Sequence, residues 1–246
     1  MRAATLVLCA VSCGGGRPGS GESRLMVSAA ASLRDAVTTI ARDFSARHPH
    51  TRPQLNFDSS GSLRRQIESG APVDVFLAAS AEDVDALVRS GNVAAGDRRV
   101  FAKNRLVLIG GPGVRALSDL GSPSVRRIGI GNPKSVPAGR YARAWLQAEG
   151  LWDTVQPKLV LGEDVRHVTS YVRRGEVDAA LVYATDAKVA RIEPAVVAAG
   201  DEVPEILYEA VLVRSLARRR NAGRFLEYLL SDPARRVLLD AGFLPP

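Results

Sequence analysis

The feature of this sequence that most constrains its fold is a regular alternation of strand-like and helix-like segments from residue 24 onward. Short runs of apolar residues, typical of buried strands, alternate with longer segments whose apolar residues recur every three or four positions. The first such segment carries its apolar stripe from Leu33 to Phe44. An alternating order of strands and helices predicts parallel sheets with right-handed crossovers, so we expect a fold of the α/β class.

The expected elements fall into two series, and the second series begins near Asn104. Strands are predicted over 25–27, 55–57, 73–78, 106–109, 128–130, 159–161, 179–183 and 206–213. Helices are predicted over 33–44, from the segment 59–62 through Leu63 and Ile67 to Gly70, and over 139–149, 165–174, 222–230 and 233–241. A further helix, the third along the chain, carries Val84, Leu87 and Val88. Ser80 and Asp83 are expected to form a capping box at the start of the third helix.

Two αβ series with one late strand suggest two lobes joined by two crossings of the chain, which is the layout of a hinged ligand-binding protein. A chain of 246 residues is long enough for both lobes. We expect each lobe to contain a mixed, mainly parallel sheet flanked by helices. The expected division is lobe I over 24–103 plus 210–246, and lobe II over 104–209.

Residue usage excludes several kinds of site. Both cysteines, Cys9 and Cys13, lie within the first thirteen residues, so the folded body has no thiol for a disulfide, a nucleophile or a thiolate metal site. His48, His50 and His167 lack the spacing of a metal cluster. Aromatic residues make up only 5% of the chain, and the basic residues behind its formal charge of +7 are scattered. We therefore expect no cofactor and no nucleic-acid partner.

The amino terminus resembles a bacterial export signal. Its apolar run over 3–11 is too short to span a bilayer and is short for a signal peptide. Residues 10–13, Ala-Val-Ser-Cys, resemble the lipobox of bacterial lipoproteins, in which the cysteine is acylated. We expect 1–13 to be a lipoprotein-type signal peptide ending at Cys13, and 14–23 to be a flexible tether. Secretion without an anchor and a leader without a targeting role are the alternatives.

Small and hydroxyl-bearing residues recur at the junctions between a predicted strand and the helix that follows it. The four segments of this kind are Ala29-Ala30-Ala31-Ser32, Ser59-Ser60-Gly61-Ser62, Pro137-Ala138-Gly139 and Glu163-Asp164-Val165. Unpaired N–H groups and a partial positive charge at each helix start make several converging starts an anion site. In an open α/β sheet these starts lie where ligands bind. Each serine alone could instead be a helix cap, and Tyr183, which ends a buried strand, could be an ordinary core residue.

Motifs of other ligand-binding and enzyme classes are missing. The sequence contains no P-loop, no dinucleotide-binding fingerprint and no nucleophile elbow. The glycine-rich segment 110–113 follows a strand, but its proline lacks the N–H that phosphate binding needs, so it predicts a turn. A hydrolase that used Ser32 or Ser60 would need a histidine that we cannot place nearby. We expect that the protein is not an enzyme.

Six short segments occur in a characteristic order along the chain. They are Ala29-Ala30-Ala31-Ser32-Leu33, Ser59-Ser60-Gly61-Ser62-Leu63, Gly70-Ala71-Pro72-Val73-Asp74-Val75-Phe76, Asn132-Pro133 with Val136-Pro137-Ala138-Gly139, Glu163-Asp164-Val165-Arg166, and Val182-Tyr183. Together they resemble the substrate-binding proteins of bacterial molybdate ABC transporters, and the resemblance runs from about Leu25 to Phe243. One departure is Tyr208-Glu209, where members often have Tyr-Pro; it is expected to concern the return crossing and not the site.

The resemblance implies a two-lobe fold of the type II periplasmic-binding-protein kind and five residues that hold the molybdate oxyanion. Ser32 and Ser60 would donate hydroxyl and backbone N–H groups, Ala138 and Val165 backbone N–H groups, and Tyr183 its phenolic hydroxyl. Donors without acceptors select a fully deprotonated oxyanion. Tungstate is nearly isosteric with molybdate, so the sequence does not separate the two anions. Sulfate is smaller, so fixed donor positions would exclude it through stretched hydrogen bonds.

The resemblance also implies an extracytoplasmic binding protein that captures molybdate, and tungstate as well, and delivers it to a permease with a cytoplasmic ATPase. We expect a monomer that contacts the membrane only through a lipid anchor. One alternative is a receptor for sulfate or phosphate; phosphate needs a carboxylate acceptor, and Asp58 and Asp164 flank the expected site. Another is the effector-sensing domain of a regulator, which would require a DNA-binding segment in the few residues before Arg24.

Overall fold

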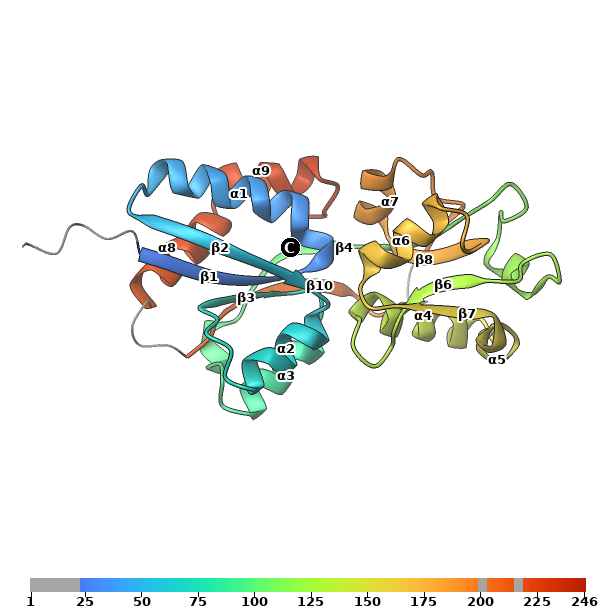
Figure 1. Cartoon of the computed structure of the whole chain (residues 1–246), viewed down its shortest axis with the longest axis horizontal. Helices are drawn as coiled ribbons and strands as arrows, with labels where there is room; N and C mark the ends of the chain where they lie inside the picture. The colour runs from blue at the N-terminus through green and yellow to red at the C-terminus, as the bar shows by residue number, and fades with distance from the viewer. Residues whose placement is uncertain (1–22, 199–202, 215–218) are drawn as a thin grey trace, which may run out of the picture.

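The structure is a computed structural model that describes residues 23–198, 203–214 and 219–246. Within these ranges the chain forms two lobes, each built on one five-stranded sheet with helices against it (Figure 1). The chain passes into lobe II at Arg105 and returns between the last strand of lobe II and the strand at 206–212. The proposal of two lobes with helix-flanked, mixed sheets is confirmed. The predictions for residues 1–22 lie outside the described residues, and Ser23, expected to be the last residue of the tether, already begins the first strand.

The sheet of lobe I has the strand order β2-β1-β3-β10-β4. Its strands are β1 (Ser23–Ala30), β2 (Thr51–Asp58), β3 (Val75–Ala78), β4 (Arg99–Asn104) and β10 (Ile206–Leu212). β1 runs parallel to β2 and β3, whereas β10 runs antiparallel to β3 and β4. The elements that accompany this sheet are a 3-10 turn η1 (Ala31–Leu33) and helices α1 (Arg34–Arg47), α2 (Ser60–Glu68), α3 (Ala81–Arg89), α8 (Arg219–Leu229) and α9 (Asp232–Asp240).

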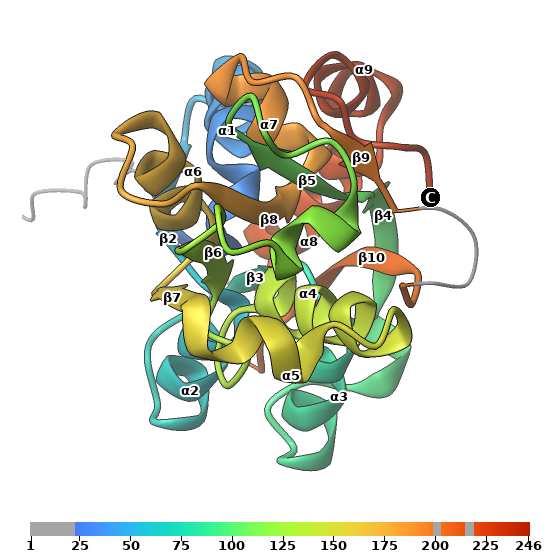
Figure 2. The same cartoon turned by 90° about the vertical axis from the view of Figure 1, so that its right-hand side faces the viewer.

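The sheet of lobe II has the strand order β7-β6-β8-β5-β9. Its strands are β5 (Leu106–Gly110), β6 (Ile128–Gly131), β7 (Leu159–Gly162), β8 (Ala179–Tyr183) and β9 (Val196–Val197). β6 runs parallel to β7 and β8, and β5 runs antiparallel to β8 and β9. Its helices are α4 (Pro137–Ala148), α5 (Trp152–Val155), α6 (Val165–Arg173) and α7 (Ala184–Ala190). Figure 2 shows α4 and α5 on one face of this sheet and α6 and α7 on the other.

The apolar stripe predicted from Leu33 to Phe44 is buried as expected. Its residues on α1 pack into the core of lobe I, and Leu33 is buried in the preceding 3-10 turn. Phe44 meets Phe225 of α8 edge to face, with ring centroids 5.2 Å apart. The stripe therefore packs α1 against the core of lobe I and against helix α8 from the carboxyl-terminal part of the chain.

Two details of the expected layout differ from the structure. The boundary expected at 209/210 falls inside β10, because Ile206 and Leu207 already pair with β4 of lobe I. The crossing back to lobe I therefore precedes Ile206. Strands β4 and β9 and the short helices α5 and α7 were not predicted, since each is too short or too interrupted by polar residues to show a clear period.

The capping box expected at α3 is wrong. Ser80 is the N-cap residue, but its side chain accepts no hydrogen bond from the helix backbone. The buried Asp83 carboxylate instead pairs with two guanidinium groups, those of Arg64 at 3.2 Å and Arg140 at 2.5 Å. A charge-assisted pair with two cations is stronger than one bond to a backbone N–H, so Asp83 turns away from the cap.

Candidate anion-binding site

The five residues that sequence analysis assigned to the site come together between the two lobes. They line one small pocket, with Ser32 and Ser60 from lobe I facing Ala138, Val165 and Tyr183 from lobe II. Each belongs to η1, to the first turn of a helix or to the end of β8. The carboxyl ends of the central strands thus place all five around one point, as expected for a ligand site in open α/β sheets.

The start of α6 leaves one backbone donor for the pocket. Asp164 is its N-cap, and Oδ1 of Asp164 accepts the N–H groups of Arg166 at 2.7 Å and His167 at 2.9 Å. First-turn N–H groups have no intrahelical partner, and this cap satisfies the second and third of them. The N–H of Val165, the first residue of the helix, remains for a ligand.

The start of α4 also leaves a backbone N–H for the pocket, but for a different reason. Pro137 occupies the first helical position and has no N–H, so Ala138 supplies the first donor of this helix. Gly139 lets the helix begin directly against β6, because a Cβ there would lie 1.9 Å from the carbonyl oxygen of Gly131. This close approach aims the amino-terminal end of α4, with its partial positive charge, at the pocket.

The Ser60 hydroxyl is oriented as a donor. Its Oγ accepts the backbone N–H of Ala79 at 3.0 Å, and a backbone N–H can only donate. The proton of the buried Ser60 hydroxyl is therefore free to point at a ligand. Ser60 is the first residue of α2 and not its cap; the cap position belongs to Ser59, whose hydroxyl donates to Ser62. The alternative of Ser60 as an ordinary helix cap is wrong.

Tyr183 carries the clearest sign of a missing partner. Its side chain is buried, and its hydroxyl has no hydrogen-bond partner among the described residues. A buried unsatisfied hydroxyl costs about 1–3 kcal/mol, so its retention beside the pocket points to a ligand that accepts its proton. Burial, and next the neighbouring Tyr208, raise the pKa of Tyr183 well above its ordinary value, so it stays a donor. An ordinary core tyrosine with a satisfied hydroxyl is excluded.

The Ser32 hydroxyl lies 2.8 Å from the hydroxyl of Tyr208. The expectation that residues 208–209 do not concern the site is therefore wrong for Tyr208, which the sequence pattern around Ser32 gave no reason to single out. Glu209 does act away from the pocket: its buried carboxylate accepts two 2.9 Å hydrogen bonds from Arg98.

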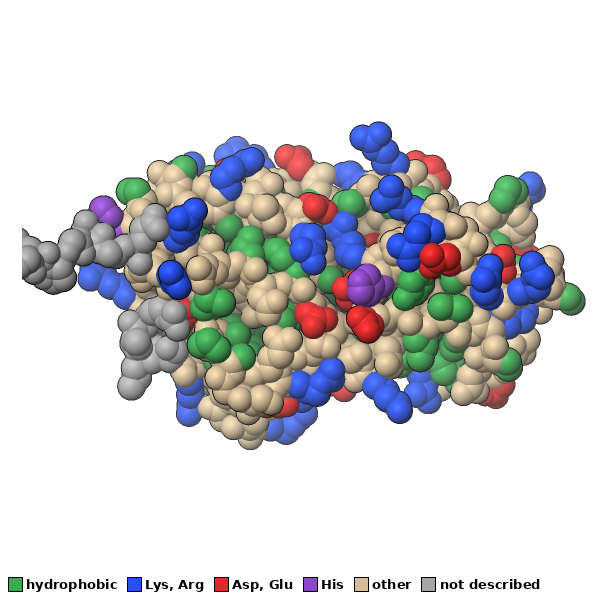
Figure 3. Space-filling view, viewed as in Figure 1, with side chains coloured by type: hydrophobic (Ala, Val, Ile, Leu, Met, Phe, Trp, Pro, Cys, Tyr) green, Lys and Arg blue, Asp and Glu red, His purple; other side chains and the backbone are tan. Residues whose placement is uncertain are grey.

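Acceptors and full charges are few around this pocket. Of the two carboxylates expected to flank the site, Asp164 lines the pocket and Asp58 does not. Among the described residues no lysine or arginine lines it. On the face shown in Figure 3, basic side chains spread over both lobes and are mixed with acidic ones. An anion here would be held by neutral donors and helix dipoles.

Contacts between the lobes surround the pocket. Arg140 of α4 reaches Asp83 of α3, and Nη2 of Arg166 on α6 lies 2.7 Å from Oδ2 of Asp35 on α1. The backbone N–H of Gly61 donates to the carbonyl of Ser135 at 3.0 Å. The described conformation is therefore closed, and both arginines near the site are engaged with carboxylates.

Arg166 also pairs with a fully buried carboxylate, and this pair predicts a pH dependence of stability. Nε of Arg166 lies 2.8 Å from Oδ1 of Asp186. Burial raises the pKa of Asp186 to about 7, although the charge of Arg166 opposes the shift. An aspartate in the unfolded chain has a pKa of about 3.9, so between this pH and about 7 the folded state binds more protons than the unfolded state. The free energy of unfolding should then fall as the pH rises from about 4 to about 7.

Asp186→Asn, which cannot ionise, should remove this decrease in the free energy of unfolding between about pH 4 and about pH 7. Urea unfolding of both proteins at several pH values over that window measures it, and Asp153→Asn on the exposed surface of α5 is the matched control. A wild-type protein and an Asp186→Asn variant with the same slope would contradict the assignment.

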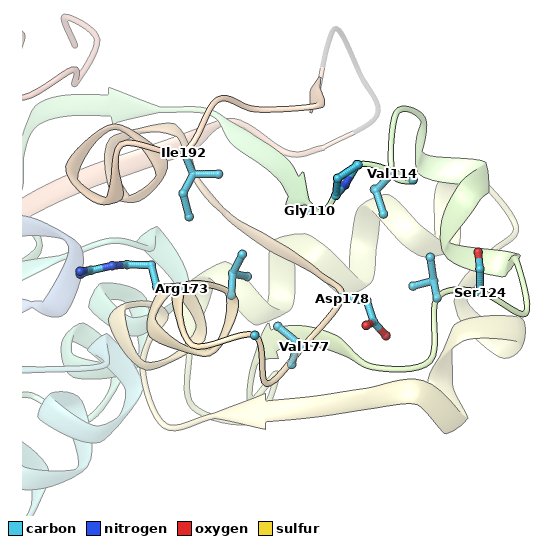
Figure 4. A pocket seen from close by; sticks show the side chains of 13 residues that line it. Gly110, Val114, Ser124, Arg173, Val177, Asp178 and Ile192 are labelled. Atoms are coloured by element: carbon cyan, nitrogen blue, oxygen red, sulfur yellow. The ribbon is translucent and has the colours of Figure 1, made fainter.

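A larger hollow at the outer end of lobe II does not have the features of a binding site. Figure 4 shows its lining, to which Gly110, Val114, Ser124, Arg173, Val177, Asp178 and Ile192 belong. Both backbone N–H groups of Arg126 and Arg127 donate to the Asp178 carboxylate at 2.8 Å, which lowers its pKa. Of the glycine-rich segment 110–113, which was predicted to be a turn, Gly110 ends β5 and residues 111–113 form the turn. Among the described residues, no buried side-chain donor without a partner lines this hollow.

Comparisons with known proteins agree with this geometry. The chain matches the family of bacterial extracellular solute-binding proteins over residues 25–244. It is 39% identical over 224 residues to YvgL of Bacillus subtilis, a candidate ABC transporter substrate-binding lipoprotein, covering 89% of this chain and 85% of that protein. It is 33% identical over 235 residues to the molybdate-binding protein ModA of Haemophilus influenzae, covering 90% of both.

A solved structure shows the same fold. The periplasmic molybdate-binding protein of Azotobacter vinelandii superposes with a TM-score of 0.81 at 27% identity, covering 90% of this chain and 99% of that one. The resemblance drawn from the six sequence segments is confirmed by these relatives. Because the family match spans both lobes, this chain belongs to the family of bacterial extracellular solute-binding proteins.

Proposed function

We propose that this protein binds molybdate between its lobes and delivers it to an ABC transporter. The observation that carries the proposal is the buried hydroxyl of Tyr183, which has no hydrogen-bond partner in the part of the chain that the structure describes. It lines the same pocket as the donor hydroxyl of Ser60 and the first-turn N–H groups of Ala138 and Val165. The similarity to molybdate-binding proteins supports the choice of anion.

The chemistry of the donors argues for a fully deprotonated tetrahedral dianion. Hydrogen phosphate brings an O–H that needs an acceptor, and in this pocket the carboxylate available is Asp164, one oxygen of which already caps α6. Sulfate is smaller than molybdate, so donors placed for molybdate would form stretched hydrogen bonds with it. Tungstate, nearly isosteric with molybdate, should bind similarly.

Calorimetric titration with molybdate, tungstate, sulfate and phosphate at fixed pH and ionic strength tests the proposal. We expect the first two anions to bind with similar affinity, and each at least about tenfold more tightly than the other two, a difference of about 1.4 kcal/mol. Tighter binding of sulfate or phosphate than of molybdate would refute it.

Closure on the anion should be visible in solution. A ligand that contacts both lobes only when they meet must shift the hinge equilibrium toward the closed form. Saturating molybdate should therefore lower the radius of gyration of the wild-type protein, measured by small-angle X-ray scattering. In Gly61→Ala the new Cβ would lie 2.4 Å from the carbonyl oxygen of Ser135 across the cleft, so this variant should bind weakly and stay expanded.

Gly96→Ala, where a Cβ meets nothing within 4 Å, is the matched control and should compact like wild type. Binding without compaction in the wild-type protein would contradict the two-lobe clamp.

Membership of an extracellular family indicates that the protein works outside the cytoplasm. We propose that it is anchored there through an acylated Cys13, that it acts as a monomer without a resident cofactor or enzymatic activity, and that its partner is a permease with a cytoplasmic ATPase. The name of YvgL as a lipoprotein supports the anchor. Mass spectrometry of protein isolated from bacterial membranes tests it: an unmodified Cys13 would refute the anchor. The helices of the described residues include none with the length and apolarity of a membrane span.

A further inference from the structure

The hydroxyl of Ser32 is connected to a buried chain of hydrogen bonds that leads away from the pocket. Oγ of Ser32 lies 2.8 Å from Oη of Tyr208, and Nδ2 of Asn104 lies 3.2 Å from the same Oη. All three side chains are buried. The chain joins η1, β10 and the end of β4, the point at which the polypeptide passes into lobe II. Ser32 is 176 positions from Tyr208 in the sequence, and Asn104 is 104 positions from it.

The direction of this chain is determined at Asn104. Its Oδ1 accepts the backbone N–H of Arg105 at 2.9 Å, so its amide nitrogen is the atom that faces Thr185 and Tyr208. An amide N–H can only donate, and Tyr208 Oη therefore accepts from Asn104. A buried proton without an acceptor is costly, and Ser32 Oγ is the other hydrogen-bond partner that the described residues give this Oη, so we assign the Tyr208 proton to Ser32. Burial raises the pKa of Tyr208 above its ordinary value, so this proton is retained.

We propose that Tyr208 is a positioning residue that makes Ser32 a hydrogen-bond donor toward the bound anion. This inference rests on the proposed function. Because the Tyr208 hydroxyl occupies an acceptor position on Ser32, the serine proton is directed into the pocket. Ser60 has the same arrangement, with the N–H of Ala79 in place of Tyr208. Ser32 and Ser60 thus both present protons, and the pocket disfavours an oxyanion that carries an O–H.

A double-mutant cycle separates this role from a general structural one. In Tyr208→Phe the ring keeps its edge-to-face contact with Phe243, at 5.1 Å between centroids, and only the hydroxyl is lost. The affinity for molybdate should fall about 2- to 12-fold, the effect of one neutral hydrogen bond. In a Ser32→Ala background the same substitution should change the affinity less than about twofold, because Tyr208 acts through Ser32. Thermal unfolding monitors the fold of each variant.

A second readout concerns selectivity. Without the Tyr208 hydroxyl, Ser32 is free to rotate and accept, so it can pair with the O–H of hydrogen phosphate. Titration at about pH 8 should show a smaller molybdate-to-phosphate affinity ratio for Tyr208→Phe than for wild type. The matched control is Tyr228→Phe on α8, whose ring packs against Phe44 and does not line the pocket; both its affinities should equal those of wild type.

The outcomes are distinct. An equal loss of molybdate affinity in both backgrounds, or no loss in wild type, would overturn the role of Tyr208 while leaving the proposed function intact. An unchanged selectivity ratio would overturn it as well. A wild-type protein that binds no molybdate would refute the proposed function itself, and this inference with it.

Discussion

Ala138→Pro should abolish molybdate binding, whereas Ala138→Gly should bind within a few-fold of wild type. Ala138 contributes its backbone N–H, because Pro137 before it has none and the later donors of this turn, those of Gly139 and Arg140, bond to the carbonyl of Val136. Proline removes the donor and places its ring carbons toward the pocket, while glycine keeps the N–H. Calorimetric titration of the two variants measures the difference.

A proline in the first turn of a helix is tolerated, because the N–H that it lacks has no intrahelical acceptor there. Thermal unfolding should therefore show that Ala138→Pro still folds. If the folded proline variant bound molybdate with near wild-type affinity, the N–H of Ala138 would not be a ligand and the site would have to be reassigned.

Tyr183→Phe and Ser60→Ala should each weaken molybdate binding by about 10- to 150-fold, or about 1.5–3 kcal/mol, because each removes a hydrogen bond to a charged, desolvated ligand. Their effects on the stability of the ligand-free protein should differ. Tyr183→Phe removes a buried hydroxyl that no other described residue hydrogen-bonds, so stability should stay the same or rise. Ser60→Ala leaves the N–H of Ala79 without its acceptor, so stability should fall.

Titration and urea unfolding of these two variants, with Arg166→Gln as the comparison, test the neutral-donor site. Arg166 does not line the pocket and pairs with Asp35 and Asp186, so its loss should weaken binding less than Ser60→Ala does. A larger loss in Arg166→Gln than in Ser60→Ala would mean that ion pairing, and not a set of neutral donors, controls affinity.

Much of the lobe architecture was predictable because it depends on short-range patterns. The period of the stripe on α1 reports which face of one helix is buried, and the small residues at 59–62 and 137–139 mark helix starts within a few positions. These signals lie within single turns or strands. They therefore indicated the two αβ series, and the position of each helix start relative to its strand then placed Ser60 and Ala138 at one edge of each sheet.

The sequence by itself determined the alternation of elements, the two-lobe plan and, through its resemblance to a family, five of the residues that line the pocket. Only the tertiary structure decided how their polar groups are oriented. The bond of Tyr208 to Ser32, the turning of Asp83 from its cap toward Arg140, and the pairing of all of β10 with lobe I join residues far apart in the chain. No local period encodes such contacts, because which partner satisfies a buried polar group depends on what folding brings within hydrogen-bond distance.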